Sequence, residues 1–481
     1  MAQVATCTSR SNTVILMSFL NGAWAHNFQK LRFSYLFLWS LTCTADQQVS
    51  EQLHGTTDSE LQYRGLVIDA GSTGSRIHVY AWNSQPCNLS EQPPLVLPTP
   101  LGSESVSSGV TSLDTLNTSM RALQDYAEQL LANERANWHR FPLYLLATAG
   151  LRRQRPEFRD KVLQALQEDL ASWPFYTRPE FVKILSGEEE GAYGWLALNA
   201  ELGVLNNPGE DSYGVLDLGG ASFQITFMPL EGHQVLQQAY PMLLNGRQSN
   251  LYAASYLQFG VVEAQRLLQR HLIAHALMAE AAVDLKHPCL PHGTTYSDAL
   301  IGTEEQIGDA PLKAVWSGHG SYEECAEKIQ ELFDKRAPCF TPPCTFDGRY
   351  QPRLGKQRFI AFSTFVSVVT DLALKPDKTT LEDIENAARY VCKMEWDTLQ
   401  ERWRDVPEYR LRMLCFSATY VVVLLHFGLG FDKQNLQIDF NMTSTFGKFS
   451  WAYGAMIWAS NYWFNPHQPK CVNENEVCPR L

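Results

Sequence analysis

Residues 65–76 read GLVIDAGSTGSR, and residues 213–224, YGVLDLGGASFQ, repeat the same pattern. In each run, an apolar stretch typical of a buried strand ends in an aspartate, Asp69 or Asp217, and small residues follow. Such a strand delivers a carboxylate to its end, and a glycine-rich turn after it exposes backbone N–H groups that can bind phosphate. One copy would be weak evidence, since turns of this composition are common in hairpins. Two copies predict two phosphate-binding hairpins that face each other across a cleft.

The length and composition are those of a large globular protein. The chain has 481 residues, of which 45% are hydrophobic and 19% charged, which argues against disorder and predicts two domains of ordinary size. The formal net charge of −12 disfavours nucleic-acid binding, which needs a basic surface. An acidic protein that binds phosphate needs local cations, so we expect a divalent metal ion and a few Arg or Lys side chains.

Further runs follow in order: residues 145–152 (LLATAGLR), 186–195 (SGEEEGAYGW), 415–420 (CFSATY) and 451–454 (WAYG). With the two hairpins, they resemble the apyrase family of nucleoside triphosphate diphosphohydrolases, the GDA1/CD39 group, over most of residues 61–465. The resemblance implies an α/β fold with two RNase H-like domains of the actin, Hsp70 and sugar-kinase superfamily and a cleft between them. It also implies hydrolysis of the terminal phosphate of nucleoside tri- and diphosphates by direct attack of water.

The predicted domains follow from the internal repeat and from the resemblance. Domain I comprises residues 61–187 and 451–481, and domain II residues 188–450. Hydrophobic periodicity predicts strands at 142–148 and 181–185, and helices at 113–133, 159–171, 191–202, 263–290 and 451–463. Residues 318–345 are predicted to form a disulfide-rich excursion.

The two hairpins supply the predicted metal and phosphate sites. Asp69 and Asp217 are placed to hold hydrated Mg²⁺ or Ca²⁺, because Mg²⁺ keeps several waters and uses one or two carboxylates. For either residue alone, an aspartate that merely forms its own turn is an even alternative. Backbone N–H groups, hydroxyls and the Arg76 guanidinium are expected to bind phosphate, although Phe223 is better explained by packing. The phosphate-binding candidates are Ser72, Thr73, Gly74, Ser75, Arg76, Gly219, Gly220, Ala221, Ser222, Phe223 and Gln224.

Three residues are the catalytic candidates. Hydrolysis of a phosphoanhydride needs a general base that deprotonates or orients the attacking water, and the resemblance places Glu190 in that role. Nothing physical in the run selects Glu190 over Glu189, and the helix macrodipole alone accounts for acidic residues at a helix start. The Thr148 hydroxyl can donate to the water or to a terminal phosphate. Gln224 is a candidate to orient the water, with a strand-edge amide as its alternative role.

Other polar and aromatic residues are less informative. Arg152 and Arg153 can equally be an ordinary solvated face. Val366 stands where some family members place an aromatic residue against the nucleobase, which leaves Phe365 and Arg412 as weak candidates for stacking. The histidines show no HExxH motif or other grouping, so we assign them no role, and no P-loop motif is present.

The cysteines predict disulfides rather than a zinc site, since no CxxC pair occurs and the chain carries features of a secreted protein. The resemblance implies the pairs Cys289–Cys325, Cys339–Cys344 and Cys392–Cys415. Proximity alone suggests a pair between Cys471 and Cys478, and Cys87 is left over. Asn88, Asn117 and Asn441 begin glycosylation sequons.

The amino terminus predicts secretion. Residues 33–42 form a short apolar run behind Lys30 and Arg32, and small residues precede Asp46, where cleavage is expected. About ten apolar residues are fewer than the roughly 20 that span a bilayer. Residues 1–45 are therefore predicted to be a signal peptide or a signal anchor, followed by a flexible segment at 46–60. Residues 416–431 are apolar but interrupted, so no other stable membrane span is expected, and the protein is predicted in the secretory lumen or outside the cell.

Three alternatives stay open at this point. One is a secretory-pathway nucleoside diphosphatase that acts mainly on UDP and GDP. Another is a kinase or a chaperone-like nucleotide switch of the same superfamily, although those need a further substrate-binding domain. The third is a nucleotide-binding protein without activity. The sequence leaves oligomeric state and base preference open.

Overall fold

The structure is a computed structural model. It describes residues 5–9, 12–16, 62–72, 74–83, 95–107, 109, 113–206, 211–229, 234–244, 247–278, 285–299, 313–441, 449–462, 472–473 and 476–477. Contacts divide the chain into two units, residues 1–61 and 62–481. In the first unit, β1 (Ala5–Ser9) pairs antiparallel with β2 (Asn12–Leu16). The predicted apolar run at 33–42 and the flexible segment at 46–60 lie outside the described residues.

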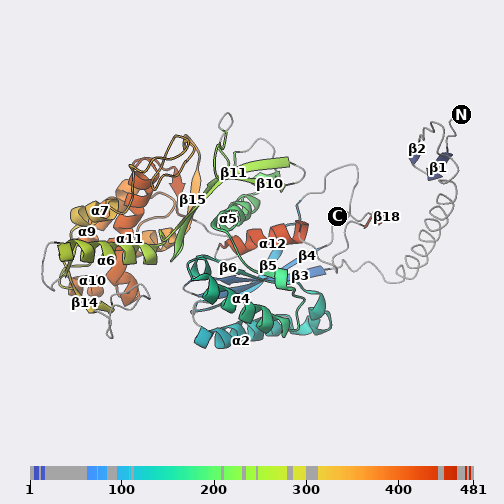
Figure 1. The fold of residues 1–481 in the computed structure, drawn as a ribbon, viewed down its shortest axis with the longest axis horizontal. Helices are drawn as coiled ribbons and strands as arrows, with labels where there is room; N and C mark the ends of the chain where they lie inside the picture. The colour runs from blue at the N-terminus through green and yellow to red at the C-terminus, as the bar shows by residue number, and fades with distance from the viewer. Residues whose placement is uncertain are drawn as a thin grey trace. The chain divides into compact units, whose positions relative to one another are not determined.

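The second unit contains two main sheets (Figure 1). The first sheet has the order β5-β4-β3-β6-β7, in which β3 pairs antiparallel with β4 and parallel with β6. Its strands are β3 (Gln62–Ala70), β4 (Ser75–Asn83), β5 (Thr99–Val106), β6 (Leu143–Ala147) and β7 (Val182–Ile184). Associated with it are α2 (Leu113–Leu130), the 3₁₀ segment η1 (Ala132–Arg140), α3 (Ala149–Arg152), α4 (Pro156–Ala171) and η2 (Pro179–Phe181).

The second sheet repeats this plan in the order β10-β11-β9-β8-β15-β16. Again a central hairpin, β8–β9, is antiparallel, and β15 and β16 continue the sheet in parallel from β8. The strands are β8 (Gly214–Leu218), β9 (Ser222–Phe227), β10 (Ala239–Leu244), β11 (Arg247–Leu257), β15 (Phe359–Ser363) and β16 (Ile438–Asp439). This repetition is the α/β architecture with two related sheets that the internal echo predicts.

Helices cover the second sheet on the side seen at the left of Figure 1. They are α6 (Val261–Met278), α7 (Tyr322–Gln330), α8 (Thr364–Asp371), α9 (Leu381–Cys392), α10 (Trp396–Arg402), α11 (Glu408–Val422) and the π-helical η4 (Val423–Gly428). A small sheet orders β12 (Leu285–His287), β14 (Lys313–Gly318) and β13 (Thr295–Ala299). The remaining elements are η3 (Val204–Asn206), β17 (Val472–Asn473) and β18 (Glu476–Val477). The helix expected at 263–290 therefore ends early and gives way to a strand.

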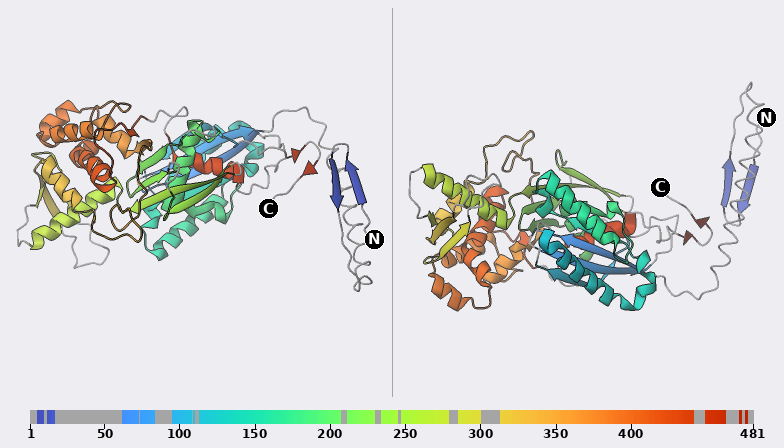
Figure 2. Two further views of the ribbon diagram at one scale, coloured as in Figure 1. Left: turned by 90° about the horizontal axis from the view of Figure 1, so that it is seen from above. Right: turned by 60° about the horizontal axis from the view of Figure 1, so that its bottom comes forward.

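Two helices pack between the sheets, as Figures 1 and 2 show: α5 (Gly187–Glu201) and α12 (Trp451–Tyr462). They approach so closely that a Cβ on Gly454 would lie 1.9 Å from the Tyr193 carbonyl oxygen. One hydrophobic core contains residues of both helices together with Val67 of the first sheet and Val215 of the second. This shared core fixes the position of the two sheets relative to each other. The domain boundaries at 187/188 and 450/451 remain predictions.

One helical stretch, residues 408–428, is long and apolar enough to cross a membrane, and 78% of its apolar window is buried inside the protein. Its side chains, Phe416 and Leu424 among them, belong to the core beneath the second sheet. Packing of this kind explains the apolar composition without a bilayer.

The structure joins the three cysteine pairs that the family resemblance implies, with S–S distances of 2.11, 1.96 and 2.04 Å. Cys392–Cys415 ties α9 to α11, and Cys289–Cys325 ties the segment after β12 to α7. Cys87, Cys471 and Cys478 lie outside the described residues.

Candidate active site

The two hairpins have matching geometry at their tips. The first loop, residues 71–74, closes with a hydrogen bond of 3.0 Å from the Gly71 N–H to the Gly74 carbonyl. The second loop, residues 219–222, closes with a bond of the same length from the Gly219 N–H to the Ser222 carbonyl. Both loops connect adjacent antiparallel strands of the same register, since Asp69 pairs across the ladder with Arg76, and Asp217 with Gln224. The repeated sequence pattern therefore corresponds to a repeated backbone conformation.

Asp69 and Asp217 carry carboxylates that are costly to ionise. Burial raises the pKa of Asp69 to about 8, with added repulsion from Glu190 and Asp217 and opposition from Arg76. Burial also raises the pKa of Asp217, while a hydrogen bond from Ser363 opposes the rise. The acidic groups that add to the rise at Asp69 come from the second sheet, Asp217, and from α5, Glu190. A cation among them would remove that cost.

Glu190 lies in the first turn of α5, beside the second hairpin. Its side chain is buried, and its Oε2 accepts hydrogen bonds from Arg152 Nη2 at 2.8 Å and from Gln224 Nε2 at 3.3 Å. The Gln224 amide also lies 2.7 Å from Ser222 Oγ in the second loop. Burial raises the pKa of Glu190 to about 7, opposed by Arg152 and assisted by Asp217. A carboxylate with such a pKa is poised to accept a proton near neutral pH.

The structure distinguishes Glu190 from Glu189, which the sequence could not do. Glu189 forms a capping box with Ser186 at the start of α5 and pairs with Lys183 at 2.7 Å. Both interactions are structural, and they occupy its carboxylate. Glu190, the next residue, instead faces Arg152 and Gln224.

Arg152 is better connected than a solvated residue would be. Besides Glu190, it donates to the Leu185 carbonyl at 3.0 Å and to Ser222 Oγ at 3.3 Å. It thus links α3, β7's end and the second loop around the candidate base. Arg153 pairs with Glu263, whose side chain is only 3% exposed. The interpretation of these two arginines as a solvated face is wrong.

Ser363 is a site residue that the sequence analysis missed. It is the last residue of β15, and its hydroxyl donates a hydrogen bond of 2.6 Å to Asp217 Oδ1. Its φ of 59° is a left-handed conformation that costs energy in a residue other than glycine. Strain of this kind is often kept where it positions a functional group, here a donor to the Asp217 carboxylate. No motif in the sequence marks it.

The structure places the other predicted residues at or beside the two loops. Thr148 is buried at the end of β6, and its N–H donates to the Ala70 carbonyl beside the first loop. Ser72 packs directly on Gly150, where a Cβ would lie 2.8 Å from the Ser72 Cα. Ser75 and Ala221 are buried, and Gly74, Arg76 and Gly220 are partly exposed at the tips. Thr73 lies outside the described residues.

Two aromatic assignments need revision or care. Phe223 is fully buried in the core, where its ring meets Phe365 edge-on. Only its backbone could meet a phosphate. Phe365 is equally buried, so its proposed stacking on a base is wrong. Arg412 lies over the Trp396 ring, 5.7 Å from its centroid.

The residues fit a divalent cation of the hard class. Asp69 and Asp217 offer oxygen ligands at strand ends, and their mutual repulsion with Glu190 is the electrostatic condition that a bound cation relieves. Ser363 orients one of them.

The comparisons with known proteins agree with this geometry. Residues 54–470 match the model of the GDA1/CD39 (nucleoside phosphatase) family. The chain belongs to this family. The family membership that the motifs predicted is therefore confirmed, and with it the prediction of an enzyme of the apyrase group.

Among curated relatives, human ectonucleoside triphosphate diphosphohydrolase 2 is 30% identical over 425 residues, covering 82% of each chain. Rat ectonucleoside triphosphate diphosphohydrolase 6 is 30% identical over 427 residues, covering 85% of each. The Golgi apyrase of Saccharomyces cerevisiae is 26% identical over 423 residues, which are 78% of this chain but 65% of that protein.

Among solved structures, the nucleoside triphosphate hydrolases from Neospora caninum align with a TM-score of 0.62 at 16% identity. The alignment covers 89% of this chain and 98% of that one. At this identity the likeness concerns the fold, and it confirms the predicted α/β architecture with two related sheets.

Proposed function

We propose that this GDA1/CD39 protein hydrolyses the terminal phosphate of nucleoside tri- and diphosphates by direct attack of water. One observation carries the proposal: the buried carboxylate of Glu190 accepts hydrogen bonds from Arg152 and from Gln224 of the second hairpin, and burial raises its pKa to about 7. Its relatives named apyrase and ectonucleoside triphosphate diphosphohydrolase support the substrate class.

In this proposal, each residue has a defined task. The first loop, with Ser72, Thr73, Gly74, Ser75 and Arg76, and the second, with Gly219, Gly220, Ala221, Ser222 and the Phe223 backbone, bind phosphate through N–H groups and hydroxyls. Glu190 accepts the proton of the attacking water, while Gln224 and Thr148 hold that water in line with the leaving oxygen. Arg152 keeps the Glu190 carboxylate turned toward the loops.

Asp69 and Asp217 would hold Ca²⁺ or Mg²⁺ through water. When bound, the ion supplies positive charge against the phosphate oxygens. Arg76 supplies the protein's own positive charge at the first loop, in the same ladder position as Gln224 in the second.

The proposed location is the secretory lumen or the outside of the cell, with the sequons at Asn88, Asn117 and Asn441 as glycosylation sites. The features that support it are the apolar run at 33–42, the disulfides, and relatives named Golgi apyrase and ectonucleoside triphosphate diphosphohydrolase.

A phosphate-release assay tests the proposal. The protein is given ATP, ADP, UDP and GDP with Ca²⁺ or Mg²⁺, and again with EDTA. We expect metal-dependent release from all four. Release from UDP and GDP alone would favour the diphosphatase alternative, and nucleotide binding without release would favour a switch or an inactive binder.

A further inference from the structure

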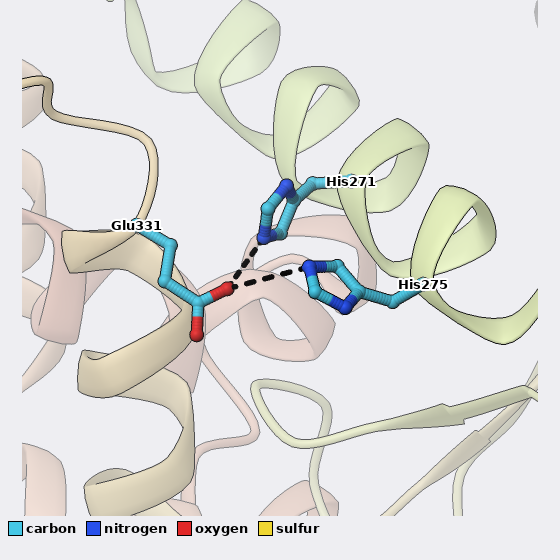
Figure 3. A group of neighbouring side chains, drawn as sticks. All are labelled: His271, His275 and Glu331. Carbon is cyan, nitrogen blue, oxygen red and sulfur yellow. Dashed lines mark hydrogen bonds and ion pairs between the residues drawn. The ribbon is translucent and has the colours of Figure 1, made fainter. Parts of the chain in front are cut away.

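A second group of metal-ligand side chains lies on the helices of the second sheet. His271 and His275 are one turn apart on α6, and Glu331 follows directly after α7. Figure 3 shows both rings turned toward the Glu331 carboxylate. His271 Nε2 lies 2.5 Å and His275 Nε2 3.8 Å from Glu331 Oε2. One ligand atom from each residue lies within 4.8 Å of the other two.

We propose that His271, His275 and Glu331 bind a divalent transition-metal ion of the zinc class, which fastens α6 to α7. Two histidines at positions i and i+4 of a helix present their rings on one face, which is a recurrent zinc-binding arrangement. Imidazole ligands favour Zn²⁺, Cu²⁺ or Ni²⁺, whereas Mg²⁺ and Ca²⁺ prefer oxygen. The site is thus chemically distinct from the one proposed at Asp69 and Asp217.

The distances are close to those of a tetrahedral site. Ligand bonds of about 2.0–2.1 Å place neighbouring ligand atoms about 3.3 Å apart. The two histidine–carboxylate separations, 2.5 and 3.8 Å, lie on either side of that spacing. The rings lie 4.5 Å apart at 67°, and the three side chains are 27%, 57% and 33% exposed. Small rotations of partly exposed side chains are enough to close the site around an ion.

The backbones that carry the ligands are held by the core. On α6, Leu268 is fully buried and Leu272 packs against the same cluster; on α7, Ile329 is fully buried there. The disulfide between Cys289 and Cys325 fixes α7 further. Ligands on anchored helices lose little conformational entropy when an ion binds.

The electrostatics of the cluster also suit a cation. His275 lies in the last turn of α6 and Glu331 directly after α7, where the helix macrodipole favours positive charge. Lys328 Nζ donates a hydrogen bond of 2.7 Å to Glu331 Oε1, which leaves Glu331 Oε2 to bind the ion. The positive charge of Lys328 opposes the cation.

Zinc titration of the full-length protein tests the inference. Zn²⁺ binding is measured by calorimetry in saturating Mg²⁺. The Mg²⁺ occupies the site proposed at Asp69 and Asp217, so the heat reports Zn²⁺ binding to sites with histidine ligands. We expect one saturable Zn²⁺ site that His275→Ala weakens by more than about tenfold, since even groups that merely orient ligands are worth about 10–100-fold. The matched control is His319→Ala, because His319 pairs with a single carboxylate, Glu324, at 3.4 Å. This control should keep the affinity of the parent protein.

Two further readouts separate a metal site from an ordinary contact. Lys328→Gln should tighten Zn²⁺ binding, because it removes a like charge. Zn²⁺ should raise the melting temperature of the parent protein but not of the double variant His271→Ala/His275→Ala. Phosphate release with Mg²⁺ should be the same in all variants. Equal Zn²⁺ affinity in the parent protein and the double variant, or no saturable Zn²⁺ binding, would overturn the proposal.

Discussion

The hairpins β3–β4 and β8–β9 have the same backbone conformation at their tips but different side chains. Each has a strand-end aspartate, a four-residue loop closed by the same hydrogen bond, and a ladder partner opposite the aspartate. In the first hairpin that partner is Arg76; in the second it is Gln224, which reaches Glu190. In the proposed function, Arg76 of the first hairpin contributes charge, and Gln224 of the second contributes orientation. The same backbone position therefore holds a cation in one hairpin and an amide in the other.

The largest expected effect concerns Glu190, the proposed general base. Glu190→Gln removes the proton acceptor and should lower phosphate release by about 10²–10⁴-fold while nucleotide binding persists. Single-turnover kinetics measures phosphate release, and calorimetry measures nucleotide binding. The matched control is Glu189→Gln, which loses the ion pair with Lys183 but can keep the capping box, and it should keep its turnover. Equal turnover in Glu190→Gln and the parent protein would remove the assignment.

The asymmetry between Gln224 and Arg76 is tested by the pair of alanine variants. Gln224→Ala should lower kcat by about 10²-fold, the usual loss for one oriented donor. Arg76→Ala should mainly raise KM, by about tenfold, since a charged hydrogen bond is worth about 1.5–3 kcal/mol. Steady-state kinetics on both separates the effects. If both variants lost the same parameter, the division of labour would be wrong.

Ser363 tests the two proposed metal-binding aspartates against each other, because Ser363 contacts Asp217 of the second hairpin. Ser363→Ala should raise the pKa of Asp217 and weaken Ca²⁺ or Mg²⁺ binding by about 10–100-fold, as loss of a group that orients a ligand does. A Ca²⁺ titration of thermal stability measures this. Thr364→Ala, one residue on, serves as control, and an unchanged metal affinity in Ser363→Ala would count against Ser363.

The smallest effect is a pH dependence of stability. Asp69 and Glu190 have folded-state pKa values of about 8 and 7, above their unfolded values. The native state therefore holds protons that the unfolded chain has released, and metal-free stability should fall as pH rises from about 5 to about 8. Ca²⁺ binds the ionised form and should flatten or reverse this slope. Chemical denaturation at several pH values, with Ca²⁺ or EDTA, checks it; a metal-free slope of opposite sign would contradict the coupling.

The sequence predicted what depends on local pattern and left out what depends on tertiary contacts. Asp69 and Asp217 could be found because a strand, an aspartate and a glycine turn are contiguous. Choosing Glu190 over Glu189 required the helix phase and the capping box, which depend on the fold. Ser363 and Arg152 act through partners more than 30 residues away, so no local signal marks them. Phe365 failed because an aromatic residue near a site can equally belong to the core.

The histidines were missed for a related reason. His271 and His275 have helical spacing, but their third partner, Glu331, is 60 residues from His271 and on another helix. A spacing of four between two histidines is common enough that it says little until the fold brings a carboxylate to the same place.

Backbone hydrogen bonds attach the second loop to the start of α6, so amide hydrogen exchange in α6 can report on the loop. The carbonyl of Gly219 accepts from the Val261 N–H, and that of Gly220 from the N–H groups of Val262 and Glu263. Any displacement of the loop must therefore expose these three amides to solvent. Their hydrogen–deuterium exchange should slow when a nucleotide analogue occupies the loop, which would report binding in a hydrolysis-deficient variant without any label on the ligand.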